Sequence, residues 1–256
     1  MGRLDNKVAI ITGGAGGIGL QAGRLFAQEG AKVLLVDLHE DALKEAAQTI
    51  GSDAVRYCAA DVTQPDHTQR YIQAAVEQFG GVDILLANAG IEGEVQPITD
   101  YAIDTFDQVM AVNVRGVWLG LKYAAPEIAK RGGGSIVITS SVAGVRGAAG
   151  VSAYIASKHA VIGLMRTAAL EMAAEKIRVN TVNPAPVDTR MMRSLEKGFE
   201  PDDPGRAKEM VSAMVPLQRY ADPVEVARIM LFLASDESSY CSGGVYMVDG
   251  GMTART

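Results

Sequence analysis

Short runs of apolar residues alternate along this chain with longer segments whose apolar residues recur every three or four positions. The first pattern is typical of strands and the second of amphipathic helices. The short runs are rich in Val and Ile and lack polar alternation, which indicates strands buried on both faces of a parallel sheet. They predict seven strands, at Val8–Thr12, Lys32–Val36, Ala54–Ala59, Asp83–Ala87, Ser135–Thr139, Arg178–Val182 and Val245–Val248.

The longer segments predict the helices that connect these strands. They run over Gly17–Glu29, Glu40–Ile50, Pro65–Phe79, Thr105–Lys130, Val151–Glu175 and Pro223–Ala234. Helices between parallel strands form right-handed crossovers that cover both faces of the sheet. The predicted fold is therefore an α/β, doubly wound parallel sheet of seven strands. The length of 256 residues suits a single domain that spans residues 1–256.

One segment interrupts this alternation. Residues 186–219 hold four prolines, several charges and the pair Met191-Met192. A stretch of this length without a clear period is uncommon inside a compact domain and often covers a functional site. We predict that residues 186–219 form a partly helical lid over a site at the edge of the sheet.

The first predicted strand runs directly into Thr12-Gly13-Gly14-Ala15-Gly16-Gly17-Ile18-Gly19, after which a helical pattern begins. Glycines allow backbone N–H groups to approach a phosphate closely, and the helix N-terminus adds unpaired donors. A glycine-rich loop without a ligand would have the same composition. Asp37, however, follows Gly19 by 18 residues, the spacing of a carboxylate that binds the ribose hydroxyls of NAD. Together these features predict an NAD site, and Leu38 in place of an arginine disfavours NADP.

Tyr154 and Lys158 lie four residues apart in a helical pattern, so both project from one face. At roughly 5 Å and an effective dielectric constant near 20, a lysine charge stabilises a phenolate by about 3 kcal/mol. This energy lowers a tyrosine pKa from about 10 toward 8, which would make Tyr154 a usable general base. Ser141 follows a strand at the carboxyl edge of the sheet, where ligands bind. A core tyrosine, a solvated lysine and a turn serine are the alternative interpretation.

In the order of these motifs, and over nearly its whole length, the chain resembles the short-chain dehydrogenase/reductase family. The resemblance implies a Rossmann-type fold, NAD as the cofactor, and roles for individual residues. Asn113 would anchor a water-linked proton relay, Ser141 would orient the substrate, and Tyr154 would exchange its proton. Lys158 would bind the nicotinamide ribose, and Thr189 would contact the carboxamide. The cofactor-binding residues implied in this way are Gly13, Gly17, Ile18, Gly19, Asp37, Asp61, Val62, Asn88, Ala89, Gly90, Tyr154, Lys158, Pro184, Val187 and Thr189.

Two positions depart from the family pattern. Ala87 stands where another Asn commonly precedes Asn-Ala-Gly, and Ala185 stands where Gly usually follows Pro184. If position 185 needs a positive φ, alanine costs about 1 kcal/mol there. If it does not, Ala185 stiffens the base of the lid. The departure at Ala185 bears on the affinity for the cofactor.

These residues predict an oxidoreductase that transfers a hydride between NAD(H) and a small secondary alcohol or ketone, with Tyr154 as general acid and base. The side chains expected around the substrate favour a hydrophobic or cyclic molecule; they are Val145, Val151, Met191, Met192 and Leu195. Arg146 and Arg190 leave an anionic substrate open. Two alternatives on the same fold are an NAD-binding regulatory protein and an NAD-dependent lyase or epimerase.

The net charge of −6 and the pI near 5.2 lack the basic footprint of a protein that binds nucleic acid or an anionic membrane. No apolar run is long enough to span a bilayer and no signal segment opens the chain, so we expect a cytoplasmic protein with a small-molecule substrate. The two cysteines and three histidines show no metal-ligand spacing, which predicts no metal site. The family resemblance implies a homotetramer, formed in part through the helices at 105–130 and 151–175.

Overall fold

The computed structural model describes residues 2–254, and its seven parallel strands form one sheet in the order β3-β2-β1-β4-β5-β6-β7. The strands are β1 (Val8–Thr12), β2 (Lys32–Asp37), β3 (Val55–Ala59), β4 (Ile84–Ala87), β5 (Gly134–Thr139), β6 (Ile177–Pro184) and β7 (Val245–Val248). All side chains of β1 and β4 are buried, because helices cover both faces of the sheet. The predicted fold class and strand number are confirmed.

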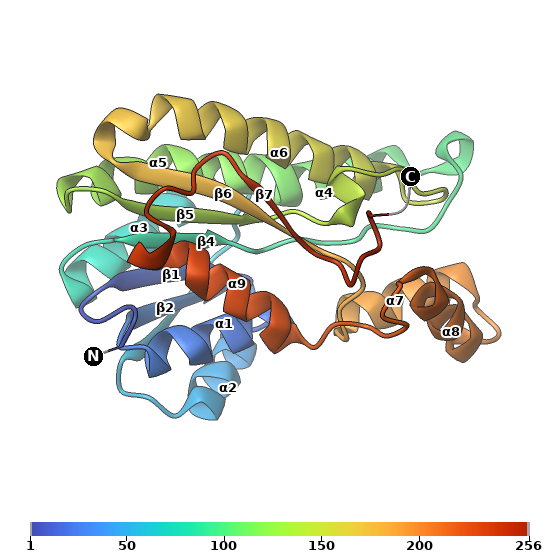
Figure 1. Cartoon of the computed structure of the whole chain (residues 1–256), viewed down its shortest axis with the longest axis horizontal. Coiled ribbons are helices and arrows are strands. Elements are labelled where there is room, and N and C mark those ends of the chain that lie inside the picture. Colours follow the sequence, from blue (N-terminus) through green and yellow to red (C-terminus); the bar gives the residue numbers. More distant parts are fainter. Residues whose placement is uncertain (1, 255–256) are drawn as a thin grey trace.

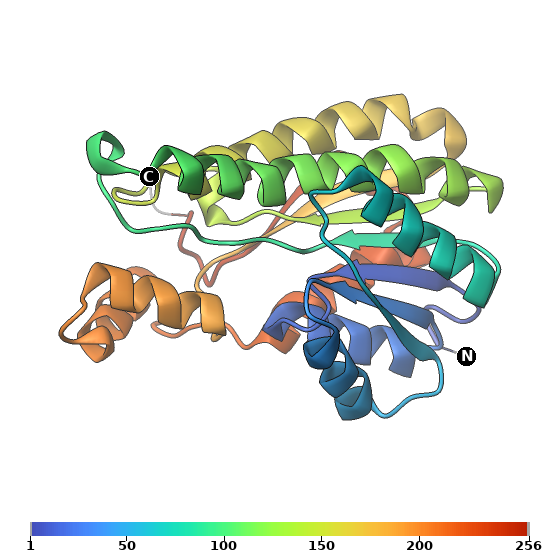
Figure 2. The same cartoon turned by 180° about the vertical axis from the view of Figure 1, so that it is seen from behind.

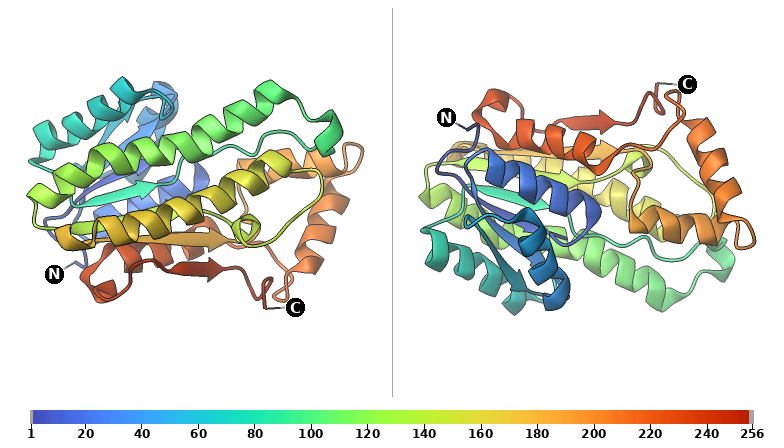
Figure 3. Two further views of the ribbon diagram at one scale, coloured as in Figure 1. Left: turned by 90° about the horizontal axis from the view of Figure 1, so that it is seen from above. Right: turned by 90° about the horizontal axis from the view of Figure 1, so that it is seen from below.

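Nine α-helices connect and flank the strands in the part of the chain that is described. They are α1 (Gly17–Gln28), α2 (Glu40–Ile50), α3 (Pro65–Phe79), α4 (Ile103–Met110), α5 (Gly116–Lys130), α6 (Ser152–Glu171), α7 (Arg190–Phe199), α8 (Pro204–Met214) and α9 (Pro223–Ala234). Helices α3, α5 and α6 cover one face of the sheet, and α1, α2 and α9 cover the other (Figure 1). Figure 3 shows α5 and α6, in green and yellow, side by side on the first face.

Two apolar clusters fill the spaces between the sheet and its helices. Successive residues of a strand alternate between them: Ile10 belongs to the cluster under α3, α5 and α6, and Ile11 to the cluster under α1, α2 and α9. This alternation explains why both neighbours are apolar. Within residues 2–254, no helix combines the length and apolarity needed to cross a bilayer.

The helix predicted over residues 105–130 is present, but it begins at Ile103 and contains a π-helical turn that the sequence did not predict. The structure has α4, then a π-helical turn at Ala111–Arg115, then α5. Asn113 lies in this turn, where its Oδ1 accepts from the Ile91 N–H at 2.8 Å and its Nδ2 donates to the Ile91 carbonyl at 2.9 Å. A π-turn adds one residue to a single turn and often marks a functional site. The pattern of apolar residues is almost the same before and after Ala111–Arg115, so the sequence does not reveal the π-turn.

Residues 186–219, the lid segment, contain α7 and α8 and lie beyond the carboxyl ends of the strands (Figures 1 and 2). Its two ends are held together, because the Asp188 N–H donates to the Ala221 carbonyl and the Ala221 N–H to the Pro186 carbonyl, both at 2.9 Å. Helix α9 begins directly after, with a capping box formed by Asp222 and Glu225. These backbone hydrogen bonds therefore hold both ends of the lid segment next to the carboxyl edge of the sheet.

Candidate active site

The glycine-rich turn after β1 forms a backbone cradle, the glycine cradle, which side chains at these glycine positions would fill. Gly13 has a φ of +66°, and a Cβ there would lie 2.9 Å from Asn88 Nδ2. A Cβ on Gly19 would collide with the Gly13 carbonyl oxygen, and one on Gly17 would lie 3.0 Å from Thr189 Cγ2. The turn leads into the N-terminus of α1, which has no side-chain cap and no acidic residue in its first turn. Free N–H groups and the helix dipole at this point fit a diphosphate.

Asp37, the last residue of β2, lies at the same edge of the sheet. Its Oδ2 accepts from the Ala15 N–H at 3.1 Å and its Oδ1 from the Leu38 N–H at 2.8 Å. These bonds orient the carboxylate at the rim of the cleft, and each oxygen retains a further lone pair. The arrangement fits the paired hydroxyls of an adenosine ribose.

Asp61 and Val62 line the cleft next to Asp37. Burial opposes ionisation of Asp61, but hydrogen bonds from the Thr63 N–H and hydroxyl to Oδ1, at 2.9 and 2.8 Å, outweigh it and lower the pKa of the carboxyl. The Asp61 N–H donates to His67 Nδ1 at 3.1 Å. His67 thus holds the backbone at the adenosine end, a role that a lone histidine in a sequence does not signal.

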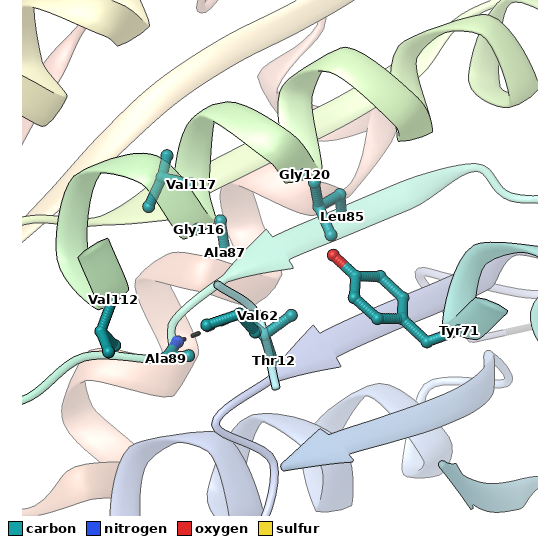
Figure 4. Close-up of a pocket in the computed structure, with 10 residues that line it drawn as sticks. All are labelled: Thr12, Val62, Tyr71, Leu85, Ala87, Ala89, Val112, Gly116, Val117 and Gly120. Atoms are coloured by element: carbon teal, nitrogen blue, oxygen red, sulfur yellow. Dashed lines mark hydrogen bonds between the residues drawn. The ribbon is translucent and has the colours of Figure 1, made fainter. Parts of the chain in front are cut away.

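Asn88 ties three strand ends together. Its Nδ2 donates to the carbonyls of Thr12 and Gly13 at 3.1 and 3.3 Å, and its Oδ1 accepts from the Thr139 hydroxyl at 3.0 Å. Thr12 Oγ1 in turn accepts from the N–H groups of Asn88 and Ala89 at 3.0 and 3.1 Å, the second of which is drawn in Figure 4. Thr12 and Thr139 are therefore site residues that the sequence interpretation missed. Each is the last residue of a predicted strand, β1 for Thr12 and β5 for Thr139.

Figure 4 also shows a small cavity behind this junction, where the Tyr71 hydroxyl lies near Leu85 and Gly120. Its volume of about 10 Å³ is close to the least space that holds one water. Ala87, one of the two departures from the family pattern, lines it. Ala87 is the last residue of β4 and is buried directly before Asn88.

The four residues predicted as catalytic come together at the carboxyl end of β5. Ser141 caps a short 3₁₀ turn, with its Oγ accepting from the Ala143 N–H at 3.1 Å and donating to the Pro184 carbonyl at 3.3 Å. Tyr154 and Lys158 lie one turn apart on α6, with Lys158 Nζ 5.4 Å from the centre of the Tyr154 ring. The Lys158 ammonium donates to the Thr139 carbonyl at 2.8 Å.

Asn113 braces this group from the other side. Besides its two bonds to Ile91, its Nδ2 donates to Ser157 Oγ at 3.0 Å, and Ser157 Oγ donates to the Tyr154 carbonyl at 2.8 Å. Gly90 packs against it so closely that a Cβ there would lie 3.3 Å from Asn113 Oδ1. The side chain of Asn113 is thus fully engaged, and Ser157, which the sequence interpretation missed, links it to the helix that carries Tyr154.

The direction of the pKa shift predicted for Tyr154 is wrong. Although its ring is partly accessible from the cleft, burial raises the pKa of Tyr154 to about 12; hydrogen bonding from Ser141 lowers it, and the Glu92 carboxylate raises it. Burial also lowers the pKa of Lys158 to about 8. The Coulomb argument from spacing omitted the loss of hydration, which is the largest influence on both groups.

These residues line one open cleft with a volume of about 560 Å³. All the predicted cofactor-binding residues except Gly19 line it, as do Ser141, Tyr154 and Lys158. Its lining also includes a set of apolar residues, which are Ala148, Val151, Met191, Met192, Leu195, Phe199, Val211, Met214 and Met252. Val145 is not in the lining, and Arg146 instead donates to the Met252 carbonyl at 2.8 Å.

Ala185 costs no backbone strain. The non-glycine residues with positive φ in the described chain are Asn6, Lys176 and Gln218, so position 185 does not need glycine. Ala185 is buried, and its N–H donates to the Val248 carbonyl at 3.1 Å. The methyl group therefore stiffens the base of the lid segment without a conformational penalty.

Comparison with known proteins agrees with this geometry. A family model described as enoyl-(acyl carrier protein) reductase matches residues 13–253. The chain is 37% identical to levodione reductase from Leifsonia aquatica, over 98% of this chain and 96% of that protein. It is 35% identical to cyclohexanol dehydrogenase from an Acinetobacter species, over 99% and 97% of the two chains. The chain belongs to the short-chain dehydrogenase/reductase family and is an enzyme of that class.

Solved structures lead to the same family. A crystal structure of levodione reductase matches with a TM-score of 0.96 at 35% identity, covering 99% of this chain and all of that one. A structure of NAD⁺-bound xylitol dehydrogenase matches with a TM-score of 0.91 at 34% identity, covering 97% and 99% of the two chains. The order and pairing of the seven strands are therefore those of the family fold.

Proposed function

We propose that this enzyme transfers a hydride between NAD(H) and a hydrophobic or cyclic secondary alcohol or ketone. The observation that carries the proposal is the position of Ser141 and Tyr154, where the cofactor cleft meets the apolar side chains of the lid segment. The Met, Leu and Phe side chains in this lining favour a substrate with apolar surface. The similarity to a dehydrogenase named for cyclohexanol supports a cyclic alcohol.

Asp37 supports NAD as the cofactor in preference to NADP. Its oriented carboxylate would accept hydrogen bonds from the two ribose hydroxyls and repel a phosphate in their place. Leu38, which follows it and is 58% exposed, offers no cation to a phosphate. The similarity to an NAD⁺-bound xylitol dehydrogenase agrees with this preference.

When bound, the oxidised cofactor supplies a hydride acceptor and a positive ring beside Tyr154. Ser141 and Tyr154 hold the hydroxyl of the alcohol, and the Tyr154 phenolate accepts its proton while the carbon–hydrogen bond breaks. Lys158 keeps a positive charge near the phenolate, and Asn113 holds the backbone at Ile91 where a relay water would bind. In the reverse direction, the burial that raises the pKa of Tyr154 keeps it protonated, so it donates directly to the ketone oxygen.

The test measures reduced-nicotinamide absorbance with NAD or NADP over a panel of cyclic, aromatic and acidic secondary alcohols. Tyr154→Phe removes the proton acceptor and is expected to lower turnover by at least about 100-fold while NAD binding persists. Turnover retained in this variant would refute the assignment. NAD binding without turnover on any substrate would favour a regulatory protein, and substrate consumption without accumulated NADH would favour a lyase or epimerase.

A further inference from the structure

Arg190 carries a positive charge that no side chain among the described residues 2–254 pairs with. Of the arginines in residues 2–254, it alone lines the cleft, and it forms no ion pair or side-chain hydrogen bond within that range. Neighbouring arginines differ: Arg193 pairs with Asp188 and Glu196, and Arg219 pairs with Glu225. A guanidinium is always charged and presents five donors in a planar fork. Such a group at the wall of a binding cleft is available to an anionic ligand.

The backbone places Arg190 next to the glycine cradle. Thr189 precedes the first residue of α7, and a Cβ on Gly17 would lie 3.0 Å from its Cγ2. Helices α1 and α7 therefore begin in the same corner of the cleft. Side chains of a helix tilt toward its N-terminus, and Arg190 is the first residue of α7, so this tilt favours a direction toward the same corner.

The charges along the cleft indicate which anion fits. Asp37 and Asp61 line the adenosine end, while the ammonium of Lys158 is buried at the catalytic end and bonded to Thr139. Between them the α1 N-terminus contributes a partial charge of only about +0.5. A diphosphate at the glycine cradle carries more negative charge than this, so a further cation at this corner would neutralise more of it.

We infer that Arg190 binds the diphosphate of the dinucleotide cofactor and thereby couples cofactor binding to the position of α7. The inference rests on the proposed function. A carboxylate on the substrate is the competing ligand, but the substrate side of α7 carries Met191, Leu195 and Phe199, spaced at one turn along the helix. Arg190 lies a quarter-turn or more away from that apolar stripe and directly after Thr189, whose methyl group lies next to the glycine cradle.

The experiment compares Arg190→Gln with Arg206→Gln, a matched change at an exposed arginine of α8 that does not line the cleft. Calorimetry measures the binding of ADP-ribose, which has the diphosphate but no nicotinamide, and of adenosine, which has no phosphate. Arg190→Gln is expected to weaken ADP-ribose binding about tenfold and to leave adenosine binding unchanged. Arg206→Gln should alter neither, and Arg190→Lys should restore part of the affinity.

Equal ADP-ribose affinity in the wild type and Arg190→Gln would overturn the inference while leaving the proposed function in place. The same result together with a raised KM for an acidic alcohol would assign Arg190 to the substrate instead. A folded wild-type protein that binds neither ADP-ribose nor NADH would refute the proposed function as well. Far-UV circular dichroism of each variant establishes that it is folded.

Discussion

Two effects shift the pKa of Tyr154 in opposite directions, and the sequence does not show which of them is larger. The four-residue spacing to Lys158 favours the phenolate, and that pairing is present with Nζ 5.4 Å from the ring centre. Burial nevertheless raises the pKa of Tyr154 to about 12. The loss of hydration on burial destabilises the phenolate more than the attraction of the buried Lys158 ammonium stabilises it. The reactivity of Tyr154 in alcohol oxidation therefore also depends on the other charges near its ring.

Glu92 is one such charge, and Glu92→Gln provides a test at this scale. The carboxylate raises the pKa of Tyr154, so its removal should lower that pKa and increase the phenolate fraction at a given pH. The rising limb of the pH profile for alcohol oxidation is expected to move about 0.5 unit toward lower pH. Glu94→Gln, on an exposed neighbour, is the control. A shift toward higher pH would contradict the assignment.

His67 provides a second residue-scale prediction, at the adenosine end of the cleft. His67→Ala leaves the Asp61 N–H without its acceptor, and the expected result is a KM for NAD raised about fivefold with kcat unchanged. His67→Asn supplies an amide oxygen at a similar position and should restore most of the affinity. Equal KM values for the wild type and the Ala variant would show that the bond does not position the site.

At the scale of the element, most of the architecture follows from local pattern. All seven strands occur within about two residues of their predicted bounds, since burial on both faces leaves little polar alternation to misread. The π-turn at Ala111–Arg115 could not be predicted, because it is held by contacts between Asn113 and Ile91, 22 residues away. Residues 186–219 were expected to be partly helical, but the number and bounds of the helices were not predicted, because prolines and mixed charges obscure their period.

The lid segment is held by an ionic cluster rather than by an apolar core. Glu196, on α7, is 2% exposed; Arg193 Nη1 donates to its Oε2 at 2.9 Å and Arg193 Nη2 to Asp188 at 2.6 Å. Arg193 and Lys208 both lie over the Tyr220 ring, at 5.6 and 5.5 Å from its centre. Burial and the Glu196 carboxylate raise the pKa of Tyr220, so its hydroxyl stays protonated beside Glu196.

Arg193→Met should loosen this cluster, because it leaves a buried carboxylate without its cation. The expected cost is about 2 kcal/mol, which corresponds to roughly 30-fold faster amide hydrogen exchange over residues 190–214. Lys197→Met, at an exposed position of the same helix, is the matched control. Unchanged exchange over 190–214, measured by mass spectrometry, would show that other contacts hold α7 and α8.

At the scale of the molecule, large apolar side chains remain exposed around the helical layer that contains α5 and α6. Ile103 on α4, Trp118 on α5 and Leu170 on α6 are 77, 47 and 82% exposed. Isolated apolar residues are common on surfaces, but three on adjacent helices fit an interface between subunits. This pattern supports our proposal of a homotetramer, which first rested on family resemblance.

Sedimentation tests this proposal, because it gives the mass of the protein in solution, which can be compared with the 27.0 kDa of one chain. The wild type is expected to sediment as a tetramer, and Trp118→Glu should shift it to a smaller species by placing a charge in an apolar contact. Lys44→Glu, on the exposed side of α2, introduces the same residue away from these helices and should leave the tetramer intact. A monomeric wild type at working concentration would refute the proposal.

The sequence by itself determined the seven strands, the helices between them, the glycine turn and the pairing of Tyr154 with Lys158, because each of these depends on residues close together in the chain. Tertiary structure alone decided which way the pKa of Tyr154 moves, what Asn113 and Thr12 hold, and that Ala185 is free of strain. It also decided that Arg190 faces the cleft while Arg146 binds the Met252 carbonyl. These outcomes depend on burial and on partners distant in the chain, and both are set only when the chain has packed.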